Sequence, residues 1–296
     1  MATLAAPLAR ARTHTVEMLP SEAGGVYAEL MTLLQREGAA LAPGLTLTQR
    51  MEPVEGGRQL VLALGTKALR DAAQRAAQSP AWAQVPVLAA LLPQSAWRAL
   101  AASLPKGSSA VWLDQPLERF VELARQAMPQ RRRLGVLFGP SSRVLGPLLE
   151  RAAAMRGLSL VKATVETPST ELFPALQGVL QDSDALLALP DPVLYNAESL
   201  QNILIATYRQ RVPMISYTAS HVRAGVTMAL HTPIDEVATQ VVRALRQFVN
   251  QNTLPVPETS QGFVVVVNEQ VARSLALGLP DAAELQAAIR KAEGRL

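Results

Sequence analysis

Short, continuous apolar runs alternate with amphipathic segments along most of the chain. Runs of about four to eight apolar residues bounded by glycine, proline or serine are typical of buried strands, and the segments between them have the period of helices. The predicted strands are 16–19, 45–51, 59–64, 85–92, 110–113, 134–138, 158–165, 185–189, 212–217, 225–230 and 262–267. The pattern predicts an α/β protein whose mostly parallel sheets are covered by helices on both faces.

The strand and helix pattern runs once to about residue 113 and then starts again, which predicts two Rossmann-like lobes. The predicted helices include 23–36, 67–78, 116–128, 143–156, 170–181, 197–210, 233–250 and 281–294, with Thr66 capping the second of them. The C-terminal part is too short for a third domain, so we expect it to return across both lobes. Lobe I is then 14–113 plus 231–259, lobe II is 114–230 plus 260–296, and three crossovers join them.

Composition excludes several classes of protein. Of the 296 residues, 49% are hydrophobic and 18% charged, which excludes a disordered chain, and no apolar run approaches the length of a membrane span. The chain has no cysteine, so disulfides, thiol nucleophiles and thiolate metal sites are excluded. The net charge of +4 is spread along the chain, and the single basic cluster, Arg131 to Arg133, is too small for a nucleic-acid surface.

The sequence contains no motif that indicates catalysis. It lacks the nucleophile elbow, the phosphate-binding loops and the zinc-protease motif, and its three histidines are too few for a histidine-rich metal site. We expect His221 and His231 to be exposed loop residues, and Asp182 and Asp184 to form a solvated turn with a capping role. We therefore expect neither catalysis nor a cofactor or metal.

In an open parallel sheet, ligands bind beyond the carboxyl ends of the strands, where loops and helix N-termini present N–H groups. This rule selects six loops. Those of lobe I contain Ser21, Gly65, Thr66 and Gln94, and those of lobe II span 139–142, 190–196 and 216–220. If the sheets face each other, all six loops border one inter-lobe cleft, which we expect to hold a small polar or zwitterionic molecule.

The residue types in these loops suggest specific contacts. Thr66, Ser141 and Ser142 combine hydroxyls with helix N-terminal N–H groups, which suits a carboxylate, although each can equally be a simple helix cap. Asp191 lies between two prolines straight after a buried strand, and we expect it to accept from an ammonium group. Tyr195 and Tyr217 can wall an apolar portion of the ligand or pack as ordinary core or rim aromatics.

Four segments of the second lobe resemble a known family. They are LERFVELARQAMPQRRRLGVLFGPSS at 117–142, ALLALPDPVLYNAESLQNIL at 185–204, RVPMISYTASHVRAGVTMAL at 211–230 and VVVNEQVARSLALGLP at 265–280. LVLALGTKAL at 60–69 and VPVLAALLP at 85–93 are similar in the first lobe. In order and spacing these segments resemble the substrate-binding proteins of ABC importers that share a fold with tryptophan- and tyrosine-type binders.

The resemblance implies a two-lobed periplasmic-binding-protein type I fold that closes on an amino acid or a related small molecule and delivers it to a membrane permease. It also implies that the loop at Ser141 and Ser142 holds the ligand's carboxylate and that Asp191 holds its amine. The loop at Gly65 and Thr66 would contribute from the other lobe.

Three segments depart from the family's pattern. The acidic residue expected after the strand at 85–92 is replaced by the LLPQ of 91–94, and the polar pair after the hydroxyl loop is replaced by Arg143 and Val144. The aromatic–glycine helix start after the crossover strand is replaced by HTPID at 231–235. Each change touches the expected cleft, so the ligand need not be an amino acid. The alternative to an importer component is a ligand-sensing or interaction module of the same fold that acts on a partner protein.

The first residues bear on location. Residues 2–8 are small and apolar, and 9–11 have the small-x-small form of a secretory cleavage site, without the basic region and longer apolar stretch of a complete signal. They are either the tail of an export signal or an ordinary N-terminus. With the resemblance, they predict a periplasmic protein that meets the membrane only through a partner.

Overall fold

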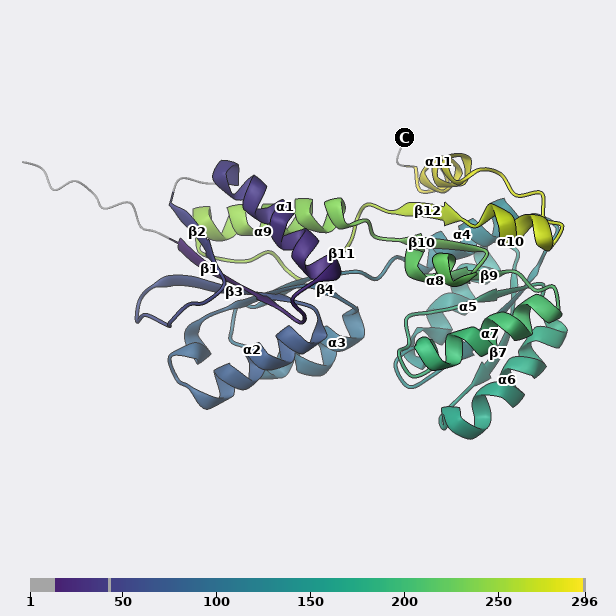
Figure 1. Cartoon of the computed structure of the whole chain (residues 1–296), viewed down its shortest axis with the longest axis horizontal. Coiled ribbons are helices and arrows are strands. Elements are labelled where there is room, and N and C mark those ends of the chain that lie inside the picture. The colour runs from purple at the N-terminus through teal and green to yellow at the C-terminus, as the bar shows by residue number, and fades with distance from the viewer. Residues whose placement is uncertain (1–13, 42–43, 295–296) are drawn as a thin grey trace, which may run out of the picture. The chain divides into compact units, whose positions relative to one another are not determined.

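The computed structural model describes residues 14–41 and 44–294, so the predicted export segment at 2–11 lies outside the described residues. The chain forms two compact units (Figure 1). Unit 1 consists of 1–113 and 234–260, and unit 2 of 114–233 and 261–296. The chain therefore passes between the units three times. Within the described ranges, no helix has both the length and the apolarity needed to cross a membrane.

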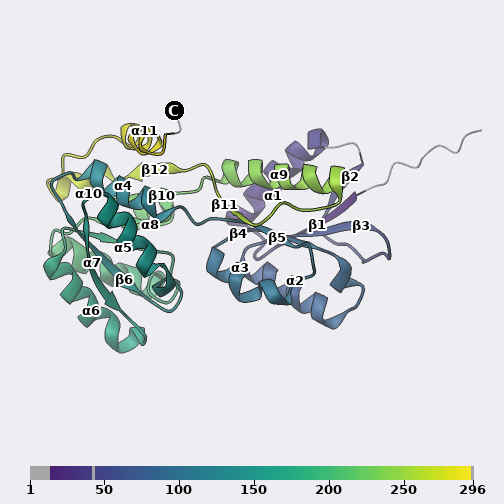
Figure 2. The same ribbon diagram turned by 180° about the vertical axis from the view of Figure 1, so that it is seen from behind.

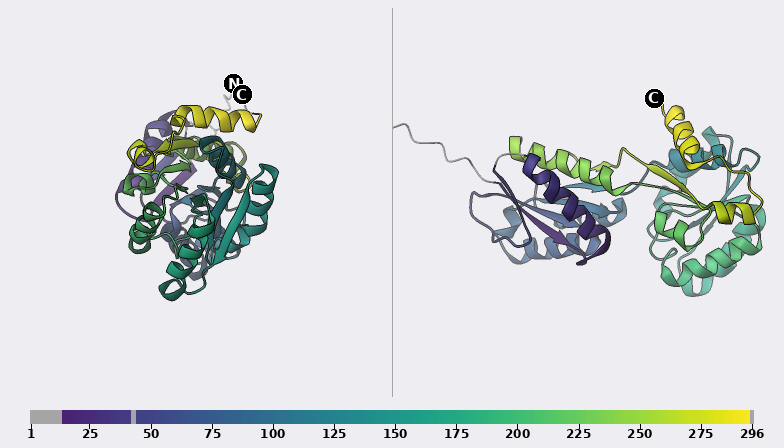
Figure 3. Two further views of the ribbon diagram at one scale, coloured as in Figure 1. Left: turned by 90° about the vertical axis from the view of Figure 1, so that its right-hand side faces the viewer. Right: turned by 45° about the horizontal axis from the view of Figure 1, so that its top comes forward.

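Unit 1 is a six-stranded parallel sheet between two layers of helices. Its elements are β1 (His14–Pro20), α1 (Gly25–Leu41), β2 (Leu45–Thr48), β3 (Arg58–Leu64), α2 (Thr66–Gln78), η1 (Trp82–Gln84), β4 (Val87–Leu92), α3 (Gln94–Leu100), η2 (Ala101–Ser103), β5 (Ser109–Trp112), α9 (Ile234–Gln251) and β11 (Glu258–Thr259). The strand order is β11-β5-β4-β3-β1-β2. Helices α1 and α9 lie side by side on one face, and α2 and α3 cover the other (Figure 3, right).

Unit 2 repeats this design with one antiparallel edge strand. Its elements are α4 (Leu117–Ala127), β6 (Arg133–Phe138), η3 (Arg143–Leu145), α5 (Gly146–Met155), β7 (Ser159–Thr164), α6 (Pro168–Asp182), β8 (Ala185–Leu187), α7 (Ala197–Arg209), β9 (Met214–Ser216), α8 (Ala219–Ala224), β10 (Met228–His231), β12 (Val264–Val267), α10 (Glu269–Ser274) and α11 (Ala282–Ala292). The strand order is β12-β10-β9-β8-β6-β7. Helices α4, α5 and α11 pack on one face, while α6 and α7 pack on the other (Figure 2).

The strands form where the sequence can bury both faces of the sheet. The run QLVLAL in β3 is buried at every position, and so is VLAALL in β4, because helices cover both sides. Each helix turns one apolar face inward. In α2, for example, Ala68, Leu69, Ala72 and Ala73 are the buried residues.

Both sheets have the same doubly wound connectivity, which fixes where ligand loops gather. In each unit the first strand pairs on one side with the second and on the other with the third, so that β1 lies beside β3 and β6 beside β8. At such a switch point the loops after the two neighbouring strands leave in opposite directions and open a crevice. A ligand is therefore expected at the loops after β1 and β3 and at those after β6 and β8.

The antiparallel edge of unit 2 contains a long insertion. Strands β10 and β12 pair directly, with Met228 opposite Val267 and His231 opposite Val264, although residues 234–260 of unit 1 lie between them in the sequence. The insertion separates two strands that would otherwise form an ordinary hairpin.

A buried polar network joins the ends of the connecting segments inside unit 2. The amide nitrogen of Gln115 donates to Thr232 Oγ1 at 2.6 Å and to the carbonyl of Gly262 at 3.0 Å. Arg119 is 1% exposed, and its guanidinium donates to Gln115 Oε1 and, at 2.6 Å, to Glu293 Oε1. Gln115, Thr232 and Gly262 each lie within two residues of a different passage between the units, and Arg119 and Glu293 extend this network into unit 2.

The α/β fold class with two parallel-dominated sheets and three crossovers is confirmed. The segment 143–156, predicted as one helix, is divided into η3 and α5, and the strand predicted at 45–51 ends at Thr48. Helix α8 was not predicted, because six residues are too few to show a helical period.

Candidate ligand-binding site

At the switch point of unit 2, the loop after β8 reaches into the loop after β6 through Asp191. One carboxylate oxygen, Oδ2, accepts from the backbone N–H groups of Ser141 and Ser142 at 3.0 Å each and from the Ser142 hydroxyl at 2.9 Å. The other, Oδ1, accepts from the N–H of Val193 at 3.1 Å. Asp191 and Ser142 are both 0% exposed. The N–H groups predicted to bind a ligand's carboxylate thus already bind a carboxylate of the protein.

Gly139 permits this close approach of the two loops. A Cβ at this position would lie 2.6 Å from Asp191 Oδ2 and 2.9 Å from Leu194 Cγ, distances that real Cβ atoms do not show. The N–H of Gly139 donates to Ser142 Oγ at 2.9 Å, so the loop is also closed on itself. The carboxylate, the loop and the glycine form one preorganised unit at the end of β6.

Three hydroxyls near Asp191 have no hydrogen-bond partner among the described residues. They belong to Ser141 and Tyr217, which are half-buried, and to Tyr195, which is 4% exposed. Burial, with the charge of Asp191 as a further cause, raises the pKa of Tyr217 to about 12. Burial also raises the pKa of Tyr195 well above its ordinary range, and Tyr217 and Asp191 add to this effect. Both phenols therefore keep their protons at neutral pH and can donate.

The two histidines predicted to be exposed loop residues are not. His221 lies in α8, half-buried, with Nδ1 2.7 Å from the buried Ser216 hydroxyl and its ring edge-on to Tyr217 at 5.1 Å. His231 ends β10 and is also half-buried. Burial lowers the pKa of both imidazoles. The prediction was wrong because the sequence did not show that α8 folds back over the end of β9.

At the switch point of unit 1, Ser21 has a role like that of Asp191. It follows β1, and its hydroxyl accepts from the N–H of Ala68 at 3.0 Å, in the first turn of α2. Gly65 is the N-cap of this helix, with φ of 91°, and a Cβ there would lie 2.5 Å from Ser21 Oγ and 2.8 Å from the Tyr27 ring. The prediction that Thr66 caps α2 is wrong, because Thr66 is already the first helical residue and makes no capping hydrogen bond.

The neighbouring loop of unit 1 carries a signal that the sequence did not show. Leu91 is 8% exposed and has φ of 58°, in the left-handed region where a leucine is rare, and the pairing of β4 with β5 is irregular there. Strained backbone of this kind clusters at functional sites. Gln94 begins α3 directly after this bend and is half-buried.

The remaining charged clusters of unit 2 are structural. Asp184 accepts from the N–H groups of Arg132 and Arg133 at 2.9 and 2.8 Å and pairs with the Arg133 guanidinium at 3.0 Å. Burial alone would raise the pKa of Asp184, but these donors lower it overall. This carboxylate joins the starts of β6 and β8, at the opposite ends of the strands from the loops above. Within the described part of the chain, no cluster of histidine and carboxylate side chains could hold a metal ion.

Solved structures share this architecture over almost their whole length. The ABC domain in complex with L-Trp from Streptococcus pneumonia has a TM-score of 0.62 at 15% identity, over 93% of this chain and 98% of its own. A substrate-binding protein with adhesive properties from Clostridium difficile, in its ligand-free, open structure, has 0.63 at 14%, over 91% and 96%. The periplasmic ribose ABC transporter protein from Conexibacter woesei has 0.51 at 12%, over 93% and 98%. The fold is that of type I periplasmic binding proteins.

Residues 106–290 match the family of ABC transporter substrate binding proteins. The chain belongs to this family, as the resemblance of its second lobe indicated. No curated protein sequence matches the chain.

Proposed function

We propose that this protein binds a small polar molecule at the carboxyl-edge loops of its sheets and presents it to an ABC permease for import, in the periplasm and without chemical change. Membership of the family supports a binding role, and the preorganised loops at the two switch points support this location. The similar structures include one with bound L-Trp and one of a ribose transporter protein, which indicates that this fold accepts polar ligands of different chemistry.

The observation that carries the proposal is the state of the donors at the unit 2 switch point. Asp191 accepts four hydrogen bonds and holds the loop at Ser141 and Ser142 in place, whereas the hydroxyls of Ser141 and Tyr217 beside it have no partner in the part of the chain that the structure describes. We assign ligand contact to Ser141 and Tyr217. Asp191 and Ser142 act as positioning residues, so the ligand is recognised by hydroxyl groups and requires no ammonium group.

For unit 1 we also assign two roles, by the place of each residue at the edge of the sheet. Ser21 and Gly65 shape the start of α2, because their contacts are with each other and with Ala68. Thr66 and Gln94, both half-buried at the same edge, are the residues that we assign to the ligand. The sequence-based prediction treated these four residues alike, whereas the proposal separates Ser21 and Gly65 from Thr66 and Gln94, which begin α2 and α3.

Calorimetric titration with a panel of amino acids, sugars and related polar metabolites tests the proposal. We expect one class to bind, and we expect Ser141→Ala and Tyr217→Phe each to weaken that binding by about three- to tenfold, as loss of a neutral hydrogen bond does. Ser159→Ala is the matched control, because Ser159 is exposed and begins β7 at the other edge of the sheet. Absence of binding by every compound at millimolar concentration would contradict the proposal.

The sensing or interaction module uses the same loops and remains the alternative hypothesis. The two functions differ in the partner. Import predicts that a permease and an ATPase are encoded beside this protein and that reconstitution with them stimulates the ATPase. Ligand-dependent capture of a non-transporter protein would indicate the alternative.

A further inference from the structure

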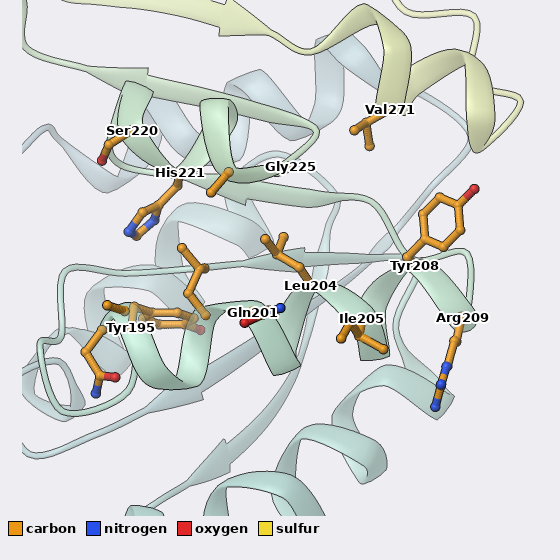
Figure 4. Close-up of a pocket in the computed structure, with 14 residues that line it drawn as sticks. Tyr195, Gln201, Leu204, Ile205, Tyr208, Arg209, Ser220, His221, Gly225 and Val271 are labelled. Carbon is orange, nitrogen blue, oxygen red and sulfur yellow. The ribbon is translucent and has the colours of Figure 1, made fainter.

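Unit 2 has a long groove on the outer side of α7, which arises from a difference in helix length. Helix α7 is 13 residues long, whereas its neighbour α8 has six and ends at Gly225, where φ is 122°. On the side of α8, the second half of α7 therefore has no helix beside it, and Val271 of α10 lies across the gap (Figure 4). The groove lies wholly within unit 2.

The groove is mostly apolar, although Asn196, Gln201, Ser220 and His221 also line it. On α7, Leu200, Leu204, Ile205 and Tyr208 follow the three- and four-residue spacing of one helix face, in addition to the face that packs into the core. Ile205 and Tyr208 are 43% and 55% exposed, although a helix that packs on a sheet needs only one apolar face. The groove therefore offers apolar surface that the fold itself does not use.

Its size and charge limit what it can hold. The volume is about 930 Å³, within the range typical of small-molecule sites. None of the lining residues is acidic, and the single charged one, Arg209, points away from the other lining side chains in Figure 4. A cationic ligand would have no counter-charge here, whereas a neutral apolar molecule of roughly ten to twenty heavy atoms would fit.

Tyr195 supplies a buried polar group without a partner among the described residues at the groove. It forms one end, is 4% exposed, and its hydroxyl is buried without a hydrogen-bond partner among the described residues. Figure 4 shows its oxygen turned toward the side chains of α7. An unmade hydrogen bond at a buried hydroxyl is unfavourable, and buried polar atoms normally have partners. Since the phenol remains protonated, the missing partner is an acceptor.

We propose that this groove binds a neutral, largely apolar small molecule through a carbonyl oxygen that accepts from the Tyr195 hydroxyl. The site differs from the ligand contacts of the proposed function, because Ser141, Ser142, Asp191 and Tyr217 do not line it. Tyr195, Asn196 and Ser220, which do, come from two of the loops that the rule for strand ends selected. The proposal assigns Tyr195 to the groove, whereas the sequence pattern placed Tyr195 among the residues of the ligand loops.

Two probes of almost equal shape test the carbonyl contact. Benzophenone is neutral and apolar with one ketone oxygen, and diphenylmethane lacks that oxygen. In saturation-transfer NMR titrations, the wild-type protein should bind benzophenone about three- to tenfold more tightly than diphenylmethane. In Tyr195→Phe this preference should disappear, while the thermal midpoint stays the same or rises because an unpaired hydroxyl has been removed. Equal affinity of the wild type for both probes would overturn the proposal.

A blocked groove tests the location. Ala224 lines the groove and is exposed, so Ala224→Phe should abolish saturable binding of both probes without unfolding the protein. Ala154→Phe is the control, because Ala154 is exposed on α5 at the other face of the sheet. Irradiated benzophenone should cross-link to α7 or α8. Cross-links confined to the loops at 139–142, or full binding by Ala224→Phe, would overturn the assignment. Ser141→Ala should leave both probes unaffected, which separates this test from that of the proposed function.

Discussion

Replacing Asp191 should loosen the loop after β6, and the structure allows the size of the effect to be worked out. In Asp191→Ala, four donors lose their acceptor, and three of them were bonded to the same oxygen. A buried donor left unpaired costs about 1–3 kcal/mol. Because Ser141 is half-exposed and water can replace part of what is lost, we expect a total near 3–5 kcal/mol. This is a large share of the stability of an ordinary domain.

Asp191→Asn should cost less. Its amide oxygen can take the place of Oδ2 and keep the two backbone N–H groups of the hydroxyl loop, while its NH₂ group then faces the N–H of Val193, a second donor. One hydrogen bond and the charge assistance of the others are lost, about 1–2 kcal/mol. The expected order of stability is wild type, then Asp191→Asn, then Asp191→Ala.

The assay can be confined to unit 2. All three tryptophans, Trp82, Trp97 and Trp112, lie in unit 1, so tryptophan fluorescence monitors that unit alone. Far-UV circular dichroism in urea follows both units, so a transition that tryptophan fluorescence does not show belongs to unit 2. Hydrogen exchange of a peptide covering 139–145 reports on the loop itself. The reasoning is refuted if Asp191→Ala unfolds at the wild-type urea concentration and its loop amides exchange no faster. If Asp191 bound an ammonium group instead, Asp191→Asn would abolish binding of amines without loosening the loop.

Four further predictions follow from contacts described above or from open space in a helix. Gly139→Ala should destabilise unit 2 by about 1–3 kcal/mol because the added methyl group has no room, whereas Gly178→Ala, in open space on α6, should stabilise unit 2 by about 0.5–1 kcal/mol. Urea denaturation should show these opposite signs, and equal shifts would contradict the packing argument. Arg119→Ala should lower the free energy of unfolding by about 3–5 kcal/mol in the same assay, since Glu293, Gln115 Oε1 and the Gln261 carbonyl lose a buried partner. A shift below 1 kcal/mol would show that the network is dispensable. Burial would raise the pKa of Glu122, but its arginine and glutamine donors lower that pKa below the ordinary 4.5, so the stabilisation from ionised Glu122 is complete above pH 4.5 and is lost as the pH falls through the folded-state pKa. Glu122→Gln should therefore be destabilising at pH 7 and nearly neutral at pH 2. A loss of stability that persists in acid would be evidence against the ion pairs. In alkaline titration followed by phenolate absorbance, the wild type should show an ionisation near pH 12 that is missing in Tyr217→Phe.

The sequence predicted those parts of the fold that depend on neighbouring residues. Continuous apolar runs such as that of β3 predicted buried strands because a strand covered on both faces needs no polar position. The restart of the pattern near residue 134 predicted the second sheet. The N-cap of α2 was misassigned by one residue, because the left-handed backbone of Gly65 is determined by contact with Ser21, 44 positions earlier in the chain.

The candidate site shows the same limit. The rule for strand ends selected loops that do follow the carboxyl ends of parallel strands, since it depends only on the topology of parallel sheets. It could not show that Asp191 and Ser142 bind each other, because that contact joins residues 49 positions apart whose side chains are each suited to a ligand. Arg119 was not singled out, because an arginine in a helix is ordinarily exposed and its partner Glu293 is 174 residues away. The groove beside α7 depends on the shortness of α8, which the sequence pattern did not show.

The pairing of β10 with β12 makes it possible to isolate half of this molecule genetically. Since His231 already pairs with Val264, deletion of 234–260 leaves two strand ends that a tight turn of about two to five residues could close. The rest of unit 2 would then be continuous in sequence from 114 onward. The resulting miniature would carry both the hydroxyl loop and the α7 groove in a polypeptide of a size suited to solution NMR. Binding measured on it would show directly how much of the recognition belongs to one half of the protein.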